Sequence, residues 1–338
     1  MAARRLLALA ASISLAFSAP VHAWGPQGHE AVGAIADKYI NASTRTKVQA
    51  ILGKGMTLQK AAVWADCAKG VIKDSNGEFV YTGKGKYPEC KPFETKAGQA
   101  VMIEFVKNNY AQCKPAPGDE VCHKQYHYAD VALQRDAYKQ GEVGTSDHDV
   151  VAAIRAAVLY LRDGKAPAPF TFASPAVALM VLVHYAGDIH QPLHVIAVYL
   201  DENGKVIDPD AGTYDPATKT DGGNKIEDGT VAIHKQWDSI PATMDATHVT
   251  PQRLASAKKL AGPAPSAPVE DWSALWATDT ITSGKPAFKG LKYSKEDSKQ
   301  QWQVTEPAGY AKARASLQSR QLNKAGVRLG QLLEKALQ

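Results

Sequence analysis

Three side chains of types that commonly bind metal ions lie within eleven residues of this chain. They are His184, Asp188 and His194, and they follow an apolar segment that begins at Ser174 and Pro175. Serine is a favourable N-cap and proline suits the first helical position, so we expect a buried helix that leads into this cluster. Positions i and i+4 of a helix share a face, so His184 and Asp188 should point to the same spot. An imidazole and a carboxylate that converge beside an apolar helix suit a divalent metal ion such as zinc.

The same pair of residue types recurs later in the chain. His234 and Asp238 are again four residues apart on a predicted helix. A single histidine of this kind is more often a hydrogen-bonded core residue than a metal ligand, but three such groups in one short stretch and a second pair favour metal binding. Further single candidates are His29, Asp66, His127 and Asp130. Four other histidines lack a comparable carboxylate partner and are interpreted as ordinary polar side chains, namely His123, His148, His190 and His248.

The first 23 residues have the pattern of a secretory signal peptide. Arg4 and Arg5 precede an apolar stretch over residues 6–17, and Val21-His22-Ala23 resembles a small-residue cleavage site. We therefore expect export to the periplasm or the medium and a mature chain that begins at Trp24. No later stretch reaches the ~18 apolar residues of a transmembrane helix. A free α-amine, with a reference pKa of ~7.7 to 8.0, can bind a metal once it is deprotonated, so the backbone of Trp24 is a candidate ligand.

Composition limits the possibilities only loosely. The formal net charge of +5 over 338 residues is a mild excess that by itself does not indicate a nucleic-acid partner. The length suffices for one large domain or two ordinary ones, with a core that needs no cross-link. Four cysteines in a chain predicted to be exported favour two disulfides. Three pairings are possible, and the short Pro/Gly loop between Cys113 and Cys122 makes that pair the favoured one.

Apolar residues at helical spacing predict a mainly helical chain. The expected helices cover residues 29–40, 43–52, 57–68, 95–110, 147–161, the segment that begins at 174, and residues 230–244, 251–260, 271–281 and 306–337. Residues 69–92 are interpreted as a surface excursion. The stretch 126–133 is too short and too aromatic to assign.

A short β element is expected after the last residue of the first cluster. Asn203-Gly204, between residues 195–200 and 205–207, predicts a β-hairpin. Residues 208–223 are rich in Asp, Gly, Pro and Thr, which indicates either an ordered functional loop or a mobile flap. The sequence contains no internal repeat, and a domain boundary would separate the candidate ligands. We therefore expect an all-α fold, with one mainly helical domain over residues 24–338 and a small β-hairpin insertion.

In combination these residues resemble the class I nucleases, the trinuclear-zinc single-strand nucleases and 3'-nucleotidases of fungi and plants, which have bacterial relatives. The resemblance rests on motifs that appear in order along the chain: Trp24 as the mature N-terminus, His29, Trp64-Ala-Asp66, the aromatic-flanked His127, the stretch from His184 to His194, Gly222-Gly-Asn224, and His234-x-x-Trp-Asp238. The motifs run from Trp24 to Asp238 and resume weakly in the last helix. The span between His194 and His234 is longer than we expect for the family, which puts the shape of the substrate groove in doubt.

The resemblance implies a cofactor of three zinc ions, and it implies which residues bind each ion. The first ion would be held by Asp66, His127, His184 and Asp188. The second would be held by the amine and carbonyl of Trp24, by His29, and by Asp188 as a bridge to the first. The third would be held by His194, His234 and Asp238.

The resemblance also implies an activity, namely hydrolysis of single-stranded RNA and DNA at the bond to the 3' oxygen, with 5'-phosphate products. Asp130 would orient the attacking water, and Tyr128 would stack on a base. Asn224 would hydrogen-bond a base edge, while Lys69 and Arg135 are candidates to contact phosphate. The expected partner is nucleic acid, with no membrane involved, and the expected state is a monomer. 3'-Nucleotides and duplexes are further candidate substrates.

Two other functions are compatible with some of these residues. Zinc-dependent phospholipase C has a similar trinuclear site and an N-terminal tryptophan, but the short spacing from Trp24 to His29 and an aspartate at position 238 favour a nuclease. A non-catalytic metal-binding protein is the second alternative. It would have no use for substrate groups such as Lys69, Tyr128 and Asn224 around the ions.

Overall fold

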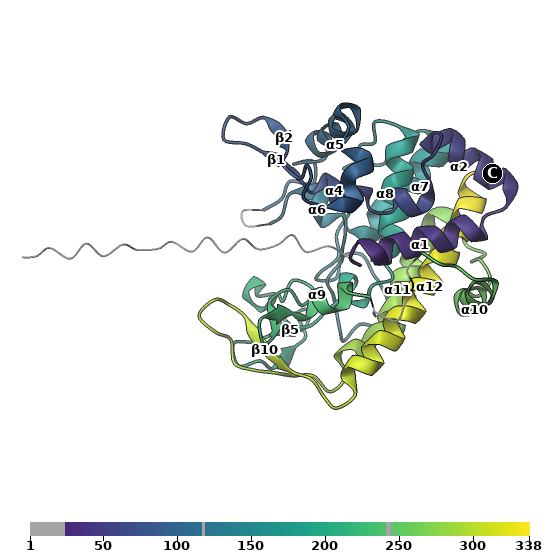
Figure 1. Ribbon diagram of the computed structural model, residues 1–338. Helices are drawn as coiled ribbons and strands as arrows, with labels where there is room; N and C mark the ends of the chain where they lie inside the picture. The colour runs from purple at the N-terminus through teal and green to yellow at the C-terminus, as the bar shows by residue number, and fades with distance from the viewer. Residues whose placement is uncertain (1–23, 117–118, 241–244, 246) are drawn as a thin grey trace, which may run out of the picture.

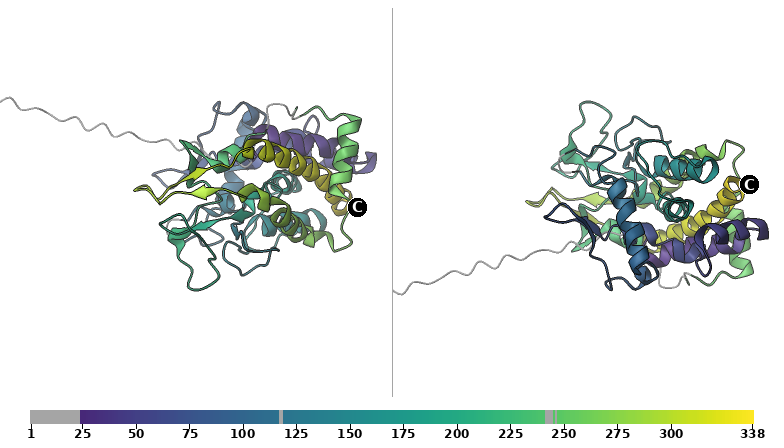
Figure 2. Two further views of the ribbon diagram at one scale, coloured as in Figure 1. Left: turned by 90° about the horizontal axis from the view of Figure 1, so that it is seen from below. Right: turned by 90° about the horizontal axis from the view of Figure 1, so that it is seen from above.

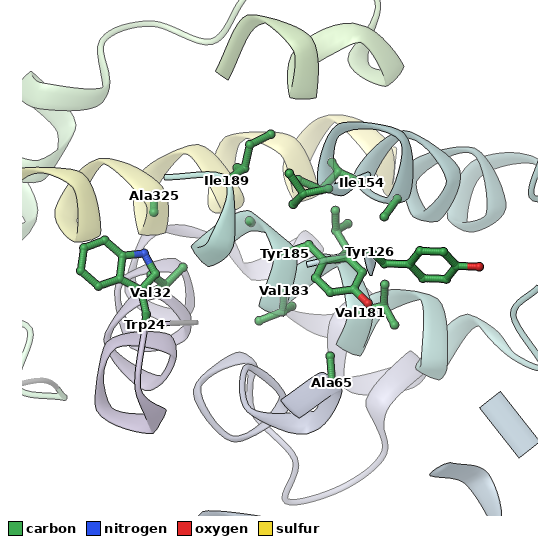
Figure 3. Close-up of a cluster of buried hydrophobic side chains, with 14 of the residues drawn as sticks. Trp24, Val32, Ala65, Tyr126, Ile154, Val181, Val183, Tyr185, Ile189 and Ala325 are labelled. Atoms are coloured by element: carbon green, nitrogen blue, oxygen red, sulfur yellow. The ribbon is translucent and has the colours of Figure 1, made fainter. Parts of the chain in front are cut away.

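A single buried helix, α8 (Pro175–Asp188), runs through the middle of the molecule. As the sequence predicts, the Ser174 side chain caps it by accepting a hydrogen bond from the Val177 N–H, and Pro175 occupies its first turn. Every residue from Val177 to Asp188 is buried, because α8 packs against α7, α12, α1, α4 and other helices. In Figure 3, side chains of α8 lie in the middle of the core, with Trp24 at one end and Tyr126 at the other.

The computed structural model describes residues 24–116, 119–240, 245 and 247–338. The predicted signal peptide at residues 1–23 therefore lies outside the described residues. Within them, the helices are α1 (Pro26–Tyr39), α2 (Ala42–Leu52), α3 (Leu58–Ala61), α4 (Trp64–Ala68), α5 (Lys96–Asn108), α6 (Cys122–Gln125), α7 (Val150–Asp163), α8, α9 (Ile233–Asp238), α10 (Pro251–Ala261), α11 (Trp272–Gly284) and α12 (Tyr310–Ala336). Short 3₁₀ helices are η1 (Pro88–Phe93), η2 (Pro192–His194), η3 (Pro216–Thr218), η4 (Val269–Asp271) and η5 (Lys285–Phe288).

The strands are short and form four separate sheets among the described residues. They are β1 (Val71–Lys73), β2 (Phe79–Tyr81), β3 (Val131–Ala132), β4 (Ile196–Ala197), β5 (Tyr199–Leu200), β6 (Val206–Ile207), β7 (Ile226–Asp228), β8 (Val231–Ala232), β9 (Lys292–Tyr293) and β10 (Trp302–Thr305). Those labelled in Figure 1, β1 and β2 at one end and β5 and β10 at the other, lie on the side of the molecule away from the C-terminus (Figures 1 and 2). The mainly helical fold with small sheets agrees with the fold class expected from the sequence.

The hairpin expected at Asn203-Gly204 is present, although its strands are shorter than predicted. Strands β5 and β6 pair antiparallel, with Tyr199 opposite Ile207 and Leu200 opposite Val206. Gly204 adopts a φ of 78°, a conformation that glycine accepts without strain. The turn packs so closely on the neighbouring hairpin that a Cβ atom at this position would lie 2.1 Å from the Ser294 carbonyl oxygen.

A four-stranded sheet, in the order β8-β7-β10-β9, was not expected from the sequence. Strand β10 alternates buried and exposed residues, and it pairs in parallel with β7 and antiparallel with β9. Two of its strands, β8 and β9, contain only two residues each, which is too short for an alternating pattern to be recognised. The helix expected over residues 230–244 is correspondingly shorter, because β8 takes its first part, α9 ends at Asp238 and residues 241–244 lie outside the described residues.

The helix expected over residues 57–68 is broken at Ala62 and Val63 into α3 and α4. The break lets the Ala62 carbonyl accept a hydrogen bond from His184 Nδ1 at 2.6 Å. Apolar spacing alone does not reveal such a break, since both pieces keep their buried faces.

Two disulfides cross-link the first half of the chain. Cys113 pairs with Cys122, the pair favoured from the sequence, and Cys67 pairs with Cys90. The second disulfide ties α4, directly after Asp66, to η1. Among the described helices, none is both long enough and apolar enough to cross a membrane.

Candidate metal centre

The first group of converging side chains lies where α4, α8 and the segment between α6 and β3 meet. His184 Nε2 lies 3.1 Å from His127 Nδ1. Asp188 Oδ2 lies 3.0 Å from His127 Nδ1 and 3.3 Å from His184 Nε2. Asp66 Oδ1 lies 3.6 Å from His184 Nε2 and 3.9 Å from His127 Nδ1. The structure therefore brings together all four side chains that the sequence analysis assigns to one ion.

His29, on α1, approaches the same carboxylate from its other side. Its Nε2 lies 3.3 Å from Asp188 Oδ1, and its ring stacks on that of His184 with centroids 3.7 Å apart. The two oxygens of Asp188 therefore face different histidines, as a bridging carboxylate requires. His29 also belongs to a compact group with Asp66 and His184, in which the candidate ligand atoms lie within 4.8 Å of one another.

Trp24 lies against the last turn of α8. Its indole Nε1 donates to the Gly187 carbonyl at 2.9 Å, and the backbone N–H of the next residue, Gly25, donates to the Asp238 carbonyl at 2.8 Å. Gly187 must lack a side chain here, because a Cβ atom would lie 2.8 Å from His29 Nδ1. The start of the mature chain predicted from the sequence is thus packed beside His29 and tied to two of the elements that carry candidate ligands.

The second cluster contains His194, at the end of η2, with His234 and Asp238 of α9. The two imidazoles face each other with their Nε2 atoms 3.0 Å apart. Asp238 Oδ1 lies 3.8 Å from His194 Nε2, and Asp238 Oδ2 lies 3.5 Å from His234 Nε2. Gln191 Nε2 donates to Asp238 Oδ1 at 2.8 Å and so orients the carboxylate, while Oδ2 has no hydrogen-bond partner among the described residues.

The hydrogen bonds of these two histidines fit a metal ion. His194 Nδ1 lies 2.8 Å from the His127 carbonyl, and His234 Nδ1 lies 2.8 Å from the Gly222 carbonyl. A carbonyl only accepts, so each Nδ1 carries a proton and each neutral ring has a lone pair on Nε2. Two lone pairs that face each other at 3.0 Å repel unless a cation lies between them. This arrangement, with a buried carboxylate beside it, suits a zinc-type ion.

The buried environment keeps most of these histidines in the neutral form that binds metal. Burial lowers the pKa of His29 to about 4 and, with the nearby His194, lowers the pKa of His234 to about 3. His184 differs, because burial alone would lower its pKa but the Asp188 and Asp66 carboxylates outweigh that effect and raise it. Burial opposes ionisation of Asp188 as well, yet His184 and the hydrogen bonds from its neighbours hold the Asp188 pKa well below its usual value.

Asp130 lies at the edge of the second cluster. Its side chain is 3% exposed, and a Cβ atom placed on Gly222 would lie 3.5 Å from Asp130 Oδ1 and 3.3 Å from His234 Nδ1. Asp130 and His234 therefore flank the same point of the backbone. The other oxygen, Asp130 Oδ2, lies 3.3 Å from the ammonium of Lys219. Burial raises the pKa of Asp130, and the Lys219 charge opposes that rise.

Lys69 lies beside the first group. Its Nζ lies 2.8 Å from Asp66 Oδ1, three residues earlier in the chain. Burial alone would lower the pKa of Lys69, but Asp66 and Asp188 outweigh it and raise the pKa, so the ammonium stays charged. A fixed cation thus stands next to a candidate metal ligand.

The two predicted base contacts are partly exposed residues. Tyr128 is partly exposed, and its hydroxyl donates to Glu120 Oε2 at 3.3 Å. Asn224 Nδ2 donates to the Asp221 carbonyl at 2.8 Å, whereas Asn224 Oδ1 has no hydrogen-bond partner among the described residues. That oxygen is buried, and the predicted contact of Asn224 with a base stays a prediction.

Arg135 is placed differently from the other candidates. Its guanidinium pairs with Asp208, and its Nε lies 3.3 Å from Asp210 Oδ2. Both carboxylates belong to the segment between His194 and His234. The structure thus engages Arg135 in holding that segment, and a role in phosphate binding stays a prediction.

The histidines interpreted as ordinary polar residues lie in varied surroundings. His190 is buried between the Ala186 carbonyl and Arg328, and His148 contacts Asp147 and Gln125. His123 is buried, and neither ring nitrogen has a hydrogen-bond partner among the described residues.

One residue at the site was missed from the sequence. Lys219 lies against Asp130 and Asp221, and its Nζ is 5.8 Å from the centroid of the Tyr128 ring. It belongs to the Asp-, Gly- and Thr-rich segment, which has no periodic pattern. No local signal in the sequence distinguishes this lysine from a solvated surface residue.

Two comparisons with known proteins identify relatives of this chain. The S1/P1 Nuclease family model matches residues 24–338. Nuclease S1 of Aspergillus oryzae is 30% identical over 241 residues, which cover 70% of this chain and 60% of that protein. The chain thus aligns with about 60% of the length of this curated relative. The family match begins at Trp24, the residue that the sequence analysis predicts as the mature N-terminus.

Proposed function

Because this chain belongs to the S1/P1 nuclease family, we propose that it is an exported, zinc-dependent phosphodiesterase. Its substrates are single-stranded RNA and DNA, and its products carry 5'-phosphates. It acts as a monomer through one domain that covers residues 24–338, and 3'-nucleotides and duplexes are further substrates to be tested. The family assignment supports a nuclease, and the converging side chains support a metal-dependent one.

One observation carries the proposal. His194 Nε2 and His234 Nε2 face each other at 3.0 Å, with both Nδ1 atoms committed to backbone carbonyls. A packed protein core tolerates such a contact when a cation lies between the two nitrogens. The nearby Asp238 Oδ2, buried and without a hydrogen-bond partner among the described residues, supplies the negative charge that the cation needs.

The proposed cofactor is three zinc ions. Asp66, His127, His184 and Asp188 would hold the first. The backbone amine and carbonyl of Trp24, with His29 and the second oxygen of Asp188, would hold the next. His194, His234 and Asp238 would hold the last. Asp188 supports a division between the first two ions, since it faces His29 with one oxygen and His127 with the other. His194, His234 and Asp238 form a compact group of their own, which supports the third site.

Zinc bound in such groups supplies a nucleophilic hydroxide at neutral pH and neutralises the charge on the attacked phosphoryl oxygens. Side chains of the protein would orient the attacking water and stabilise the developing charge. Asp130, as a carboxylate, accepts a hydrogen bond from the attacking water and so fixes its orientation. Lys69 places a positive charge beside Asp66, where the scissile phosphate would lie, and stabilises the charge that develops in the transition state.

Recognition of the base relies on two partly exposed residues. The partly exposed ring of Tyr128 offers a face for stacking, which tolerates any base and is worth roughly 1–3 kcal/mol. Asn224 would contact a base edge through its side-chain amide, whose Oδ1 is buried and has no hydrogen-bond partner among the described residues. A base must leave a duplex stack to reach both, so this arrangement favours single strands.

Metal analysis combined with nuclease gels tests the proposal. The purified mature protein should contain three zinc ions, hydrolyse single-stranded RNA and DNA, lose activity with chelator and regain it with zinc. A preparation with full zinc content that leaves both nucleic acids intact would overturn the proposal. If that preparation cleaved phosphatidylcholine instead, it would be a phospholipase C, and if it cleaved neither, it would be a non-catalytic metal-binding protein.

A further inference from the structure

Lys219 belongs to the long segment between His194 and His234, and its ammonium lies at the edge of the candidate site. Lys219 Nζ lies 3.3 Å from Asp130 Oδ2 and 3.5 Å from Asp221 Oδ1, and it is 5.8 Å from the centroid of the Tyr128 ring. Its neighbours Asp130 and Tyr128 are the residues proposed to orient water and to stack on the base. The ammonium therefore lies near both the residue proposed to orient the attacking water, Asp130, and the residue proposed to bind the base, Tyr128.

The backbone around Lys219 is anchored rather than loose. Lys219 forms a β-bridge with Tyr199 of β5, and the hydroxyl of the next residue, Thr220, donates to the Val198 carbonyl at 2.7 Å. The Lys219 carbonyl accepts a hydrogen bond from Lys225 Nζ at 3.3 Å. An anchored backbone lowers the entropic cost of holding the side chain in place for a ligand.

Asp130 separates Lys219 from the metal ligands. One oxygen, Oδ1, lies on the side of Gly222 and His234, whereas the other, Oδ2, contacts Lys219. Lys219 is thus one carboxylate further from the proposed ions than Asp130 is. The phosphate under attack lies at the ions, so Lys219 faces a different part of the substrate.

The Lys219 ammonium has capacity left for an anion. It has three N–H donors and is 30% exposed, and among the described residues the acidic groups within 4 Å of it are Asp130 and Asp221. Lys69 differs, because it is 12% exposed and its Nζ lies beside Asp66 within the first group. The two lysines therefore stand at two different distances from the proposed ions.

Building on the proposed function, we propose that Lys219 binds the phosphate on the 5' side of the nucleotide whose base stacks on Tyr128. The 3' phosphate of the same nucleotide is the one that is hydrolysed. Lys219 is then a substrate-binding residue that selects for substrates with a phosphate on both sides of this nucleotide. The enzyme prefers strands and 5'-phosphorylated dinucleotides to dinucleotides that begin with a 5'-hydroxyl.

Two dinucleotides that differ only in the 5'-phosphate test this role. Steady-state kinetics of the zinc-loaded full mature chain would compare pNpN with NpN for the wild type, K219A, K219R and K205A. Lys205 is exposed on the same segment, in the hairpin turn, and serves as the matched control. Zinc content is measured for every variant, because a change in metal loading would affect both substrates.

A charge-assisted contact with phosphate predicts about a 10-fold or greater effect, from the roughly 1.5–3 kcal/mol of such hydrogen bonds. The wild type should hydrolyse pNpN with a KM about 10-fold below that for NpN. K219A should raise the KM for pNpN to that for NpN with unchanged zinc content, and any change in kcat that follows from the altered pKa of Asp130 should be the same for both dinucleotides. K219R should keep most of the preference and K205A all of it.

Three results would overturn the inference, and they differ from one another. A K219A variant that loses kcat equally on both dinucleotides and keeps the KM preference for pNpN would show that Lys219 acts only through Asp130 or on the scissile phosphate. Equal kinetics of K219A and the wild type would show that the lysine contacts no substrate. A zinc-loaded wild type that hydrolyses neither dinucleotide nor longer strands would remove the proposed function itself.

Discussion

Asp188 is the side chain on which most of the proposed metal centre depends. It is completely buried, and its two oxygens face His29 on one side and His127 and His184 on the other. The substitution Asp188→Asn keeps the shape of the side chain but removes its charge. We expect this variant to lose the two ions that share Asp188 and to keep the ion held by His194, His234 and Asp238.

The size of the effect follows from the number of ions lost. At a free zinc concentration 100 times the Kd, one bound ion stabilises the folded protein by about 2.7 kcal/mol, so three ions that each bind with this Kd contribute about 8 kcal/mol. Asp188→Asn should reduce this zinc-dependent stabilisation to about 2.7 kcal/mol, because one ion remains. The matched control, Asp238→Asn, lies in the other cluster and should retain about 5.4 kcal/mol and two ions.

The assay combines two measurements on each protein. Metal content is determined after dialysis at a fixed free zinc concentration, and the free energy of unfolding is measured with zinc and with chelator. The expected zinc content is three ions for the wild type, one for Asp188→Asn and two for Asp238→Asn. The reasoning is refuted if Asp188→Asn retains three ions, or if the two variants lose the same number.

Three further predictions concern the start of the chain, pH and the base. A mature protein with one extra residue before Trp24 should lose one zinc ion and most of its activity, as metal analysis and mass spectrometry would show; full activity with three ions would exclude the α-amine as a ligand. Because burial lowers the pKa of His29 to about 4 and of His234 to about 3, these two rings stay neutral as the pH falls below 6.5, whereas His184, whose pKa is raised by Asp188 and Asp66, takes up a proton earlier. Zinc loss should therefore begin well above pH 4; dialysis at a series of pH values measures this, and retention of three ions down to pH 4 would contradict it. Tyr128→Ala should raise the KM for single strands by about 10-fold with unchanged zinc content, while Tyr128→Phe should resemble the wild type, because stacking needs the ring and not the hydroxyl; equal KM values for the alanine variant and the wild type would rule out stacking.

The sequence predicts those parts of the site that depend on spacing within one helix. His184 and Asp188 are four residues apart on a helix with a clear N-cap, so their convergence follows from local geometry. His234 and Asp238 follow the same rule on a much shorter helix. The apolar residues of α8 likewise identify the core helix without any knowledge of its neighbours.

Features that depend on contacts between distant segments were not predictable in the same way. The break between α3 and α4 is explained by His184, more than 120 residues away, whose ring bonds the Ala62 carbonyl. Strands β7 and β10 pair in parallel across a long separation in the sequence, which no local pattern in either strand encodes. Lys219 reaches Asp130 because the segment folds back onto β5, and nothing in its neighbouring residues encodes that contact.

The disulfide between Cys67 and Cys90 makes the first candidate metal site depend on the redox state of the compartment in which the chain folds. Cys67 directly follows Asp66, so this cross-link fixes the short helix that presents a proposed zinc ligand. In a reducing cytosol the cross-link does not persist, and a chain held there would lack part of the support for its first zinc group. If the chain hydrolyses RNA as proposed, we expect a chain held in the cytosol to be less active against the RNA of the cell that makes it. Recombinant production in an oxidising compartment should accordingly give higher zinc loading per chain than production in the cytosol.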